Sequence, residues 1–304
     1  MTTTETAAAR LAGPGPGPTP PTSAPAPASA AARRRRGRRR PGPGVELALL
    51  VLALAVLAAF APGLLTAHSP TTDDVLNKLQ PPSGDHWFGT DQLGRDVFAR
   101  VVHGAGLSLR APLIAVAIAF GVGSVLGLVA GFVGGVVDAV LMRLVDILLA
   151  VPSLLLSLAI VAALGFGITH VAVAVGIASV ASFARITRAE ALRVRSSPFV
   201  EAATVLGVRR PVVLCQHVVP HAIGPALVLS TLEFGTAILS VSALSFLGYG
   251  EPPPTPEWGK IVSEGRDYLA TAWWVALLPS LVIAATVLAT NRVSRWLDSH
   301  GTLR

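Results

Sequence analysis

Long apolar runs separated by short polar segments dominate the chain after residue 44. Six runs are long enough to cross a bilayer as helices: 45–65, and about 109–132, 140–164, 169–186, 223–247 and 270–290. As a helix, the first run would be about 31 Å long, which matches the hydrocarbon thickness of a bilayer. The pattern therefore predicts an all-α integral membrane protein with six transmembrane helices.

Composition agrees with this prediction. Of the 304 residues, 52% are hydrophobic and only 13% are charged, and that charged share is about half the value of a soluble domain. The single cysteine, Cys215, excludes an internal disulfide framework and a cysteine-rich metal site. The net charge of +7 does not imply a nucleic-acid partner, because the basic residues flank apolar runs or gather before residue 45.

The basic residues also predict an orientation. With a cytoplasmic N-terminus, 18 of the 24 Lys and Arg fall in cytoplasmic segments and 6 in outer segments. The positive-inside rule therefore places both termini in the cytoplasm, together with the loop at about 189–220.

The first 44 residues are rich in Pro, Ala and Arg and cannot bury apolar surface, so we expect a disordered cytoplasmic tail. Its basic run, 33–40, either binds the anionic headgroups of membrane lipids or only fixes the topology.

Small and kinking residues inside the runs predict how the helices pack. Gly123, Gly127 and Gly131 share one helix face, which allows a neighbouring helix to approach closely. Pro152 and Pro225 should kink or start the helices that contain them.

The loop between the fourth and fifth runs interrupts the apolar second half of the chain. Residues 200–204 can form a short helix, Gly207 can end it in a left-handed conformation, and Pro211 suits the first turn of a following helix. Arginines surround the turn: Arg185, Arg188, Arg193, Arg195, Arg209 and Arg210. The loop is either an ordinary basic connection or a part that docks on a cytoplasmic partner.

The spacing of this loop resembles the EAA loop of ABC-importer permeases. Its matching residues are Glu201, Ala202, Ala203, Gly207 and Pro220, with the His-x-x-Pro ending at 217–220 that is common in peptide-importer permeases. The resemblance implies a coupling helix that sits in a groove of an ATPase subunit. Arg209 and Arg210 could then meet acidic groups of the ATPase.

Two outer stretches resemble the same family. Residues 88–96, Phe-Gly-Thr-Asp-Gln-Leu-Gly-Arg-Asp, are similar to a signature of dipeptide/oligopeptide permeases, and 105–109 follow it as in that family. Residues 245–250 and 252–259 are similar to the segment after the fifth helix of the C-type subunit.

The resemblance implies a type I ABC-importer permease fold in the cell membrane. Its partners would be a homologous B-type permease in a heterodimer, two ATPase subunits and an extracytoplasmic substrate-binding protein. Residues 45–107 would form the first transmembrane helix plus an extracytoplasmic segment, and 108–304 the permease domain with its coupling loop.

Charged groups in the outer signature have two readings. Asp91, Arg95 and Asp96 can form a charge-paired turn, and Gly89, Thr90 and Gly94 complete the signature, the glycines supplying tight backbone. The turn either pins the first helix and its loop to the bundle or contacts the binding protein.

Ionisable groups inside the runs also need an explanation. Glu233 lies near the middle of the fifth run, where it either faces the translocation path or is hydrogen-bonded to a neighbouring helix. Asp146 lies one turn after Arg143, which predicts an intrahelical pair. Trp258, Trp273 and Trp274 are expected to mark the outer boundary of the membrane.

Catalytic motifs are missing from the sequence. It contains no Walker-type phosphate loop and no clustered Cys/His metal motif, so we expect no enzyme activity, no metal and no cofactor in this chain; ATP and Mg²⁺ would be bound by the partner ATPases. A stand-alone secondary transporter or channel is the alternative function. Nickel, glutathione or haem are alternative cargoes for the same type of permease.

Overall fold

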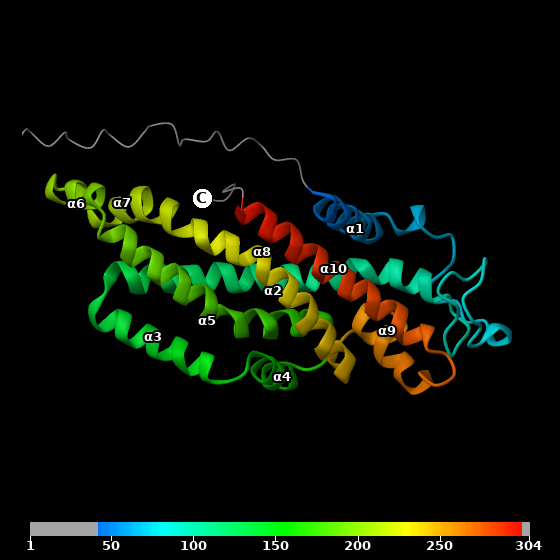
Figure 1. Ribbon diagram of the computed structural model, residues 1–304. Coiled ribbons are helices and arrows are strands. Elements are labelled where there is room, and N and C mark those ends of the chain that lie inside the picture. The colour runs from blue at the N-terminus through cyan, green and yellow to red at the C-terminus, as the bar shows by residue number, and fades with distance from the viewer. Residues whose placement is uncertain (1–41, 300–304) are drawn as a thin grey trace, which may run out of the picture. The chain divides into compact units, whose positions relative to one another are not determined.

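The computed structural model describes residues 42–299, and ten α-helices account for most of them (Figure 1). They are α1 (Pro43–Phe60), α2 (Val97–Val133), α3 (Gly135–Ala150), α4 (Ser153–Leu164), α5 (Ile168–Arg195), α6 (Pro198–Val205), α7 (Arg210–Val213), α8 (Val219–Leu244), α9 (Trp258–Gly265) and α10 (Trp274–Ser299). Nearly all of the predicted tail at 1–44 lies outside the described residues.

Among residues 42–299, five stretches are long and apolar enough to cross a membrane. They are α1, α2, α5, the continuous helical stretch 210–249 that contains α8, and α10. The third predicted run is a broken helix: α3 and α4 meet at an angle of 94°. Pro152 directly precedes α4 and explains the break, because proline cannot donate the backbone hydrogen bond that would continue α3. The six predicted spans are therefore present, with the third one bent.

The α2–α5 pair forms the most extensive helix contact in the described structure. The three glycines of α2 face α5, as their spacing predicts. A Cβ atom at Gly123 would lie 2.6 Å from the carbonyl oxygen of Val180, and one at Gly127 would clash with the carbonyl of Ala184. Only glycine allows the two backbones to come this close.

Ion pairs join α3 to α5. Arg188 of α5 binds Asp138 through two nitrogens, one of them 2.6 Å from the carboxylate, and Arg185 binds Asp146 at 2.9 Å. The predicted intrahelical pair of Asp146 with Arg143 is therefore wrong: the carboxylate reaches across to the neighbouring helix instead.

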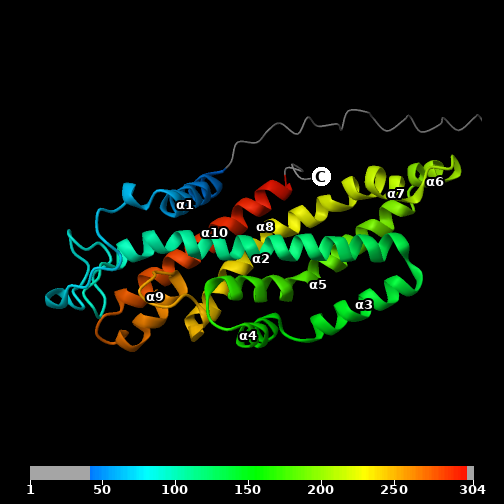
Figure 2. The ribbon, with the colours of Figure 1, turned by 180° about the vertical axis from the view of Figure 1, so that it is seen from behind.

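The two ends of the bundle are different. The α6–α7 turn projects from one end, whereas α9 and the segment 61–96 cover the other (Figures 1 and 2). Of the three tryptophans predicted to mark the outer boundary of the membrane, Trp258 and Trp274 are buried, and only Trp273 is exposed in the way expected of a membrane-boundary aromatic. Trp258 and Trp274 serve as packing groups because their ring nitrogens find buried carbonyl partners, those of Val101 and Thr90.

Candidate functional site

The α6–α7 turn is built by three residues with fixed backbone preferences. Pro198 lies in the first turn of α6, and Gly207 follows the helix with a φ of 79°, a left-handed value that favours glycine. Pro211 lies in the first turn of α7. The predicted short helix at 200–204 is present and extends to Pro198–Val205.

One face of α6 packs on its own chain. Val200 and Ala203 are buried in a cluster with Val194 of α5, Val213 of α7 and Val218. The structure thus places Ala203 inside the protein, where it holds α6 against the bundle, while Ala202 is exposed.

The opposite face of the turn is exposed and apolar. Val205 and Leu206 are 81% and 82% exposed. Glu201, Arg209 and Arg210 are exposed as well, and none has an ion pair within residues 42–299. Sequence reasoning missed Val205 and Leu206, although two adjacent aliphatic residues in a polar loop were a signal that it could have used.

Other arginines near the turn already have partners. Arg193 pairs with Glu190 within α5, and Arg195 donates to the carbonyl of Phe132 at 2.8 Å, which satisfies the C-terminal end of α2. Pro220 is exposed in the first turn of α8. Of the six arginines around the loop, only Arg209 and Arg210 are available to a partner.

The outer signature forms a buried ionic cluster. Asp91 is fully buried, and its Oδ2 atom accepts from Arg95 Nε at 2.7 Å and from Arg100 Nη1 at 2.6 Å. Glu264 of α9 contacts Arg100 Nη1 at 2.8 Å and Arg95 Nη2 at 3.4 Å. Two carboxylates and two guanidinium groups thus join the start of α2 to α9, and the carboxylate of Asp73 lies 3.9 Å from Arg95 Nε. Sequence reasoning did not identify Arg100 and Glu264, because nothing in the local pattern brings them to Asp91.

Asp96 does not join this cluster, contrary to the predicted three-residue charge pairing. It is the N-cap of α2, with Oδ1 accepting from the amide of Ala99 at 2.6 Å. Its Oδ2 atom lies 2.7 Å from Nδ1 of His86. A helix start attracts a carboxylate more strongly than a second contact with an already neutralised arginine would.

The remaining signature residues fold the outer segment against α2. Thr90 donates its hydroxyl to the carbonyl of Asn77 at 2.5 Å and accepts from the amide of Gln80 at 2.8 Å. Gly89 and Gly94 have φ values of 69° and 78°. A side chain at Gly94 would collide with the backbone of residue 74.

The stretch 252–259 packs on the start of α2. The backbone amide of Trp258 donates to Ser108 Oγ at 2.9 Å, and its ring donates to the carbonyl of Val101 at 2.8 Å. Beside it, Glu257 is fully buried, and neither carboxyl oxygen has a well-formed hydrogen bond within the described residues. Burial raises the pKa of Glu257 to about 7, although the nearby Ser245 hydroxyl partly opposes the rise.

Glu233 lies within α8 and is half-buried. Its carboxylate accepts from the hydroxyl of Thr236 on the same helix at 2.7 Å. Its hydrogen-bond partner therefore lies within its own helix, so the alternative in which a neighbouring helix holds the carboxyl has no support from these contacts.

Comparisons with known proteins agree with one family. The family model described as "Binding-protein-dependent transport system inner membrane component" matches residues 123–300. A dipeptide transport system permease protein, DppC, of Alkalihalophilus pseudofirmus is 40% identical over 78% of this chain and 78% of its own. The glutathione transport system permease protein GsiD of Escherichia coli is 42% identical over the same shares.

A solved structure shares the fold. The crystal structure of an amino acid ABC transporter with histidines matches with a TM-score of 0.52 and 17% identity, over 67% of this chain and 94% of that chain. The chain therefore belongs to the family of binding-protein-dependent transport system inner membrane components, the multi-pass permease subunits of ABC importers.

Proposed function

We propose that this chain is the C-type permease subunit of an ATP-driven importer of dipeptides or oligopeptides. It forms the translocation path with a homologous B-type permease. Two ATPase subunits bind and hydrolyse ATP, and an extracytoplasmic binding protein delivers the peptide. The chain is similar to permeases for dipeptides and for glutathione, which are both small peptides. This similarity supports peptides as the substrate class.

The exposed face of the α6–α7 turn carries the proposal. It offers two aliphatic side chains, Val205 and Leu206, flanked by unpaired charges of both signs. The two aliphatic side chains are adjacent on a turn that projects from the bundle, and a groove of a second protein can bury such a surface. With the bias of basic residues placing this end in the cytoplasm, an ATPase subunit is the partner that fits.

The same geometry suggests how movement passes between the subunits. Val200 and Ala203 fix α6 to the packed ends of α5 and α8. A displacement of α6 by a closing ATPase dimer would therefore move those two helices rather than only bend a loop. Glu233, on α8, lies on one of the helices that would move, and we assign it to the path as a carboxylate for the cationic amino terminus of the peptide.

Replacement of Leu206 by Glu tests the docking surface. Burial of one leucine stabilises an interface by about 1.5–3 kcal/mol, so its loss should weaken ATPase binding about 10- to 100-fold. The assay is co-purification of the ATPase subunits with the full transporter, expressed from its own genes, together with uptake of a labelled dipeptide.

Leu76→Glu is the matched control, because Leu76 is 91% exposed at the opposite end of the bundle. We expect Leu76→Glu to retain the ATPase subunits and Leu206→Glu to lose them. Stoichiometric ATPase recovery with Leu206→Glu would contradict the docking role. Loss of recovery with both variants would show that the effect is not specific to α6–α7.

A further inference from the structure

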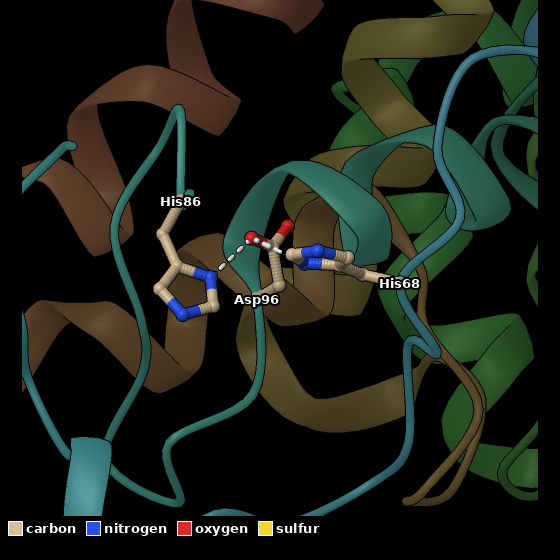
Figure 3. Close-up of side chains that lie close together, drawn as sticks. All are labelled: His68, His86 and Asp96. Carbon is tan, nitrogen blue, oxygen red and sulfur yellow. Dashed lines mark hydrogen bonds and ion pairs between the residues drawn. The ribbon is translucent and has the colours of Figure 1, made fainter. Parts of the chain in front are cut away.

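Three side chains from separate parts of the chain converge at the α9 end of the bundle (Figure 3). His68 belongs to the segment after α1, His86 to the segment before the outer signature, and Asp96 to the start of α2. We propose that they bind a divalent transition-metal ion of the Zn²⁺ class. Two imidazoles and one carboxylate form a ligand set that Zn²⁺ accepts and that harder ions such as Mg²⁺ disfavour.

The distances suit a metal site. One ring nitrogen of His68, one of His86 and a carboxylate oxygen of Asp96 all lie within 4.8 Å of one another. The Asp96 oxygen is 3.4 Å from Nδ1 of His68 and 2.7 Å from Nδ1 of His86. Ligands at about 2.0–2.1 Å from a tetrahedral ion are separated by about 3.3 Å, so His86 would move about 0.6 Å away from Asp96 and the two imidazoles would adjust toward each other by up to about 1.5 Å.

Asp96 is held in place for this role. Its Oδ1 atom caps α2 through the amide of Ala99, which leaves Oδ2 directed at the two rings. A metal bound to Oδ2 would keep the helix cap and replace only the hydrogen bond to His86. The cap thus supplies the support from outside the ligand shell that orients ligands in metal sites.

The site is open on one side. His68 is 47% exposed, while Asp96 is only 6% exposed. His68 and Asp96 line a hollow of about 270 Å³ that also contains Asp85. This hollow gives the ion a path from solvent and room for water as a fourth ligand.

Bound metal would tie the segment after α1 to the start of α2. In the described structure, His68 contacts Asp96 only at 3.4 Å, and its ring meets that of His86 edge-on at 5.4 Å between centroids. A metal would turn these weak contacts into bonds, so the site should stabilise the folded chain in proportion to metal occupancy.

Zn²⁺ titration of the full-length protein tests the proposal. The protein is purified in detergent through an affinity tag without histidine, treated with EDTA and titrated with Zn²⁺ against a chromophoric chelator. We expect one competing site per chain, insensitive to excess Mg²⁺, and a rise in melting temperature on adding Zn²⁺. Co²⁺ should give the visible absorption of a four-coordinate ion.

Variants locate the site. His68→Ala removes a half-exposed ligand, and Asp96→Asn removes the anionic ligand while keeping a residue able to cap α2. Each substitution should lower the affinity for Zn²⁺ by about 10- to 100-fold or more, because even the loss of a residue that only hydrogen-bonds to a metal ligand has an effect of that size. His170→Ala is the control, because His170 is exposed and bonded to the carbonyl of Phe166; it should leave the affinity unchanged.

Wild-type affinity in a folded His68→Ala protein would overturn the proposal, as would the absence of a Zn²⁺ site in the wild type. Melting curves in EDTA show whether each variant is folded. Because His68 is half-exposed, a folded His68→Ala protein is expected, and its affinity alone decides the outcome.

Discussion

Replacing the buried carboxyl of Glu257 by an amide should remove a pH dependence of stability. Glu257 lies outside the candidate membrane spans, and its side chain is fully buried beside Trp258. Desolvation raises its pKa from 4.5 to about 7. The folded protein therefore keeps this proton in a pH range where the unfolded chain has already released it.

The sign and size follow from this difference. Below about pH 4.5 both states are protonated and the group costs nothing. As the pH rises to about 7, the free energy of unfolding falls. Glu257 is then ionised in the unfolded chain, so folding must either take up a proton from solvent or bury a charged carboxylate. A shift of about 2.5 units corresponds to about 3 kcal/mol, which is lost by pH 8. For a chain of this size, that equals a decrease of about 5 °C in melting temperature.

The assay is thermal unfolding in detergent at intervals from pH 5 to pH 8. Between pH 5 and pH 8, the melting temperature of Glu257→Gln should fall by about 5 °C less than that of the wild type, and the variant should be more stable than the wild type at pH 8. Glu46→Gln is the control, since Glu46 is exposed in the first turn of α1. Its curve should follow that of the wild type.

An unchanged slope in Glu257→Gln would refute the reasoning, because the pH dependence would then belong to other groups. A uniform loss of stability at every pH would show that the amide fits the site poorly. Glu257→Leu would then be the better test, because leucine removes the titrating group and needs no hydrogen-bond partner.

Three further predictions concern packing and transport. Arg100→Met should cost about 3–5 kcal/mol, because it leaves a buried carboxylate pair under-neutralised, whereas Arg266→Gln at an exposed pair should change the melting temperature little. Gly127→Leu should prevent α2 from packing on α5 and abolish recovery of folded protein, while Gly121→Ala, which meets nothing within 4 Å, should be tolerated. Glu233→Gln should reduce peptide uptake more than it reduces assembly; unchanged uptake across a range of peptides would remove Glu233 from the path.

Several features of the fold followed from local pattern alone. The length of an apolar run is sufficient to predict a transmembrane helix, because a segment in lipid has to satisfy its own backbone hydrogen bonds. The glycine face of α2, the break before α4 and the turn at Gly207 were also predictable, since each depends on the conformational limits of one residue type.

Partner choice among charged side chains was not predictable in the same way. Asp146 pairs with Arg185 rather than Arg143. Asp91 pairs with Arg100 as well as with Arg95, and Arg100 in turn contacts Glu264 of α9. Which charge meets which depends on how helices far apart in sequence are rotated and offset, and spacing within one helix carries no information on that.

The sequence by itself determined the membrane spans, the position of the α6–α7 turn and the family to which the chain belongs. Only the tertiary structure decided which side chains of that turn face outward and which hold it in place. It also brought His68 and His86 to Asp96 from separate loops, where a search for local metal motifs predicts no site. The reason is physical: a helix or a turn is fixed by its own residues, whereas a binding surface or ligand set exists only after those elements have packed together.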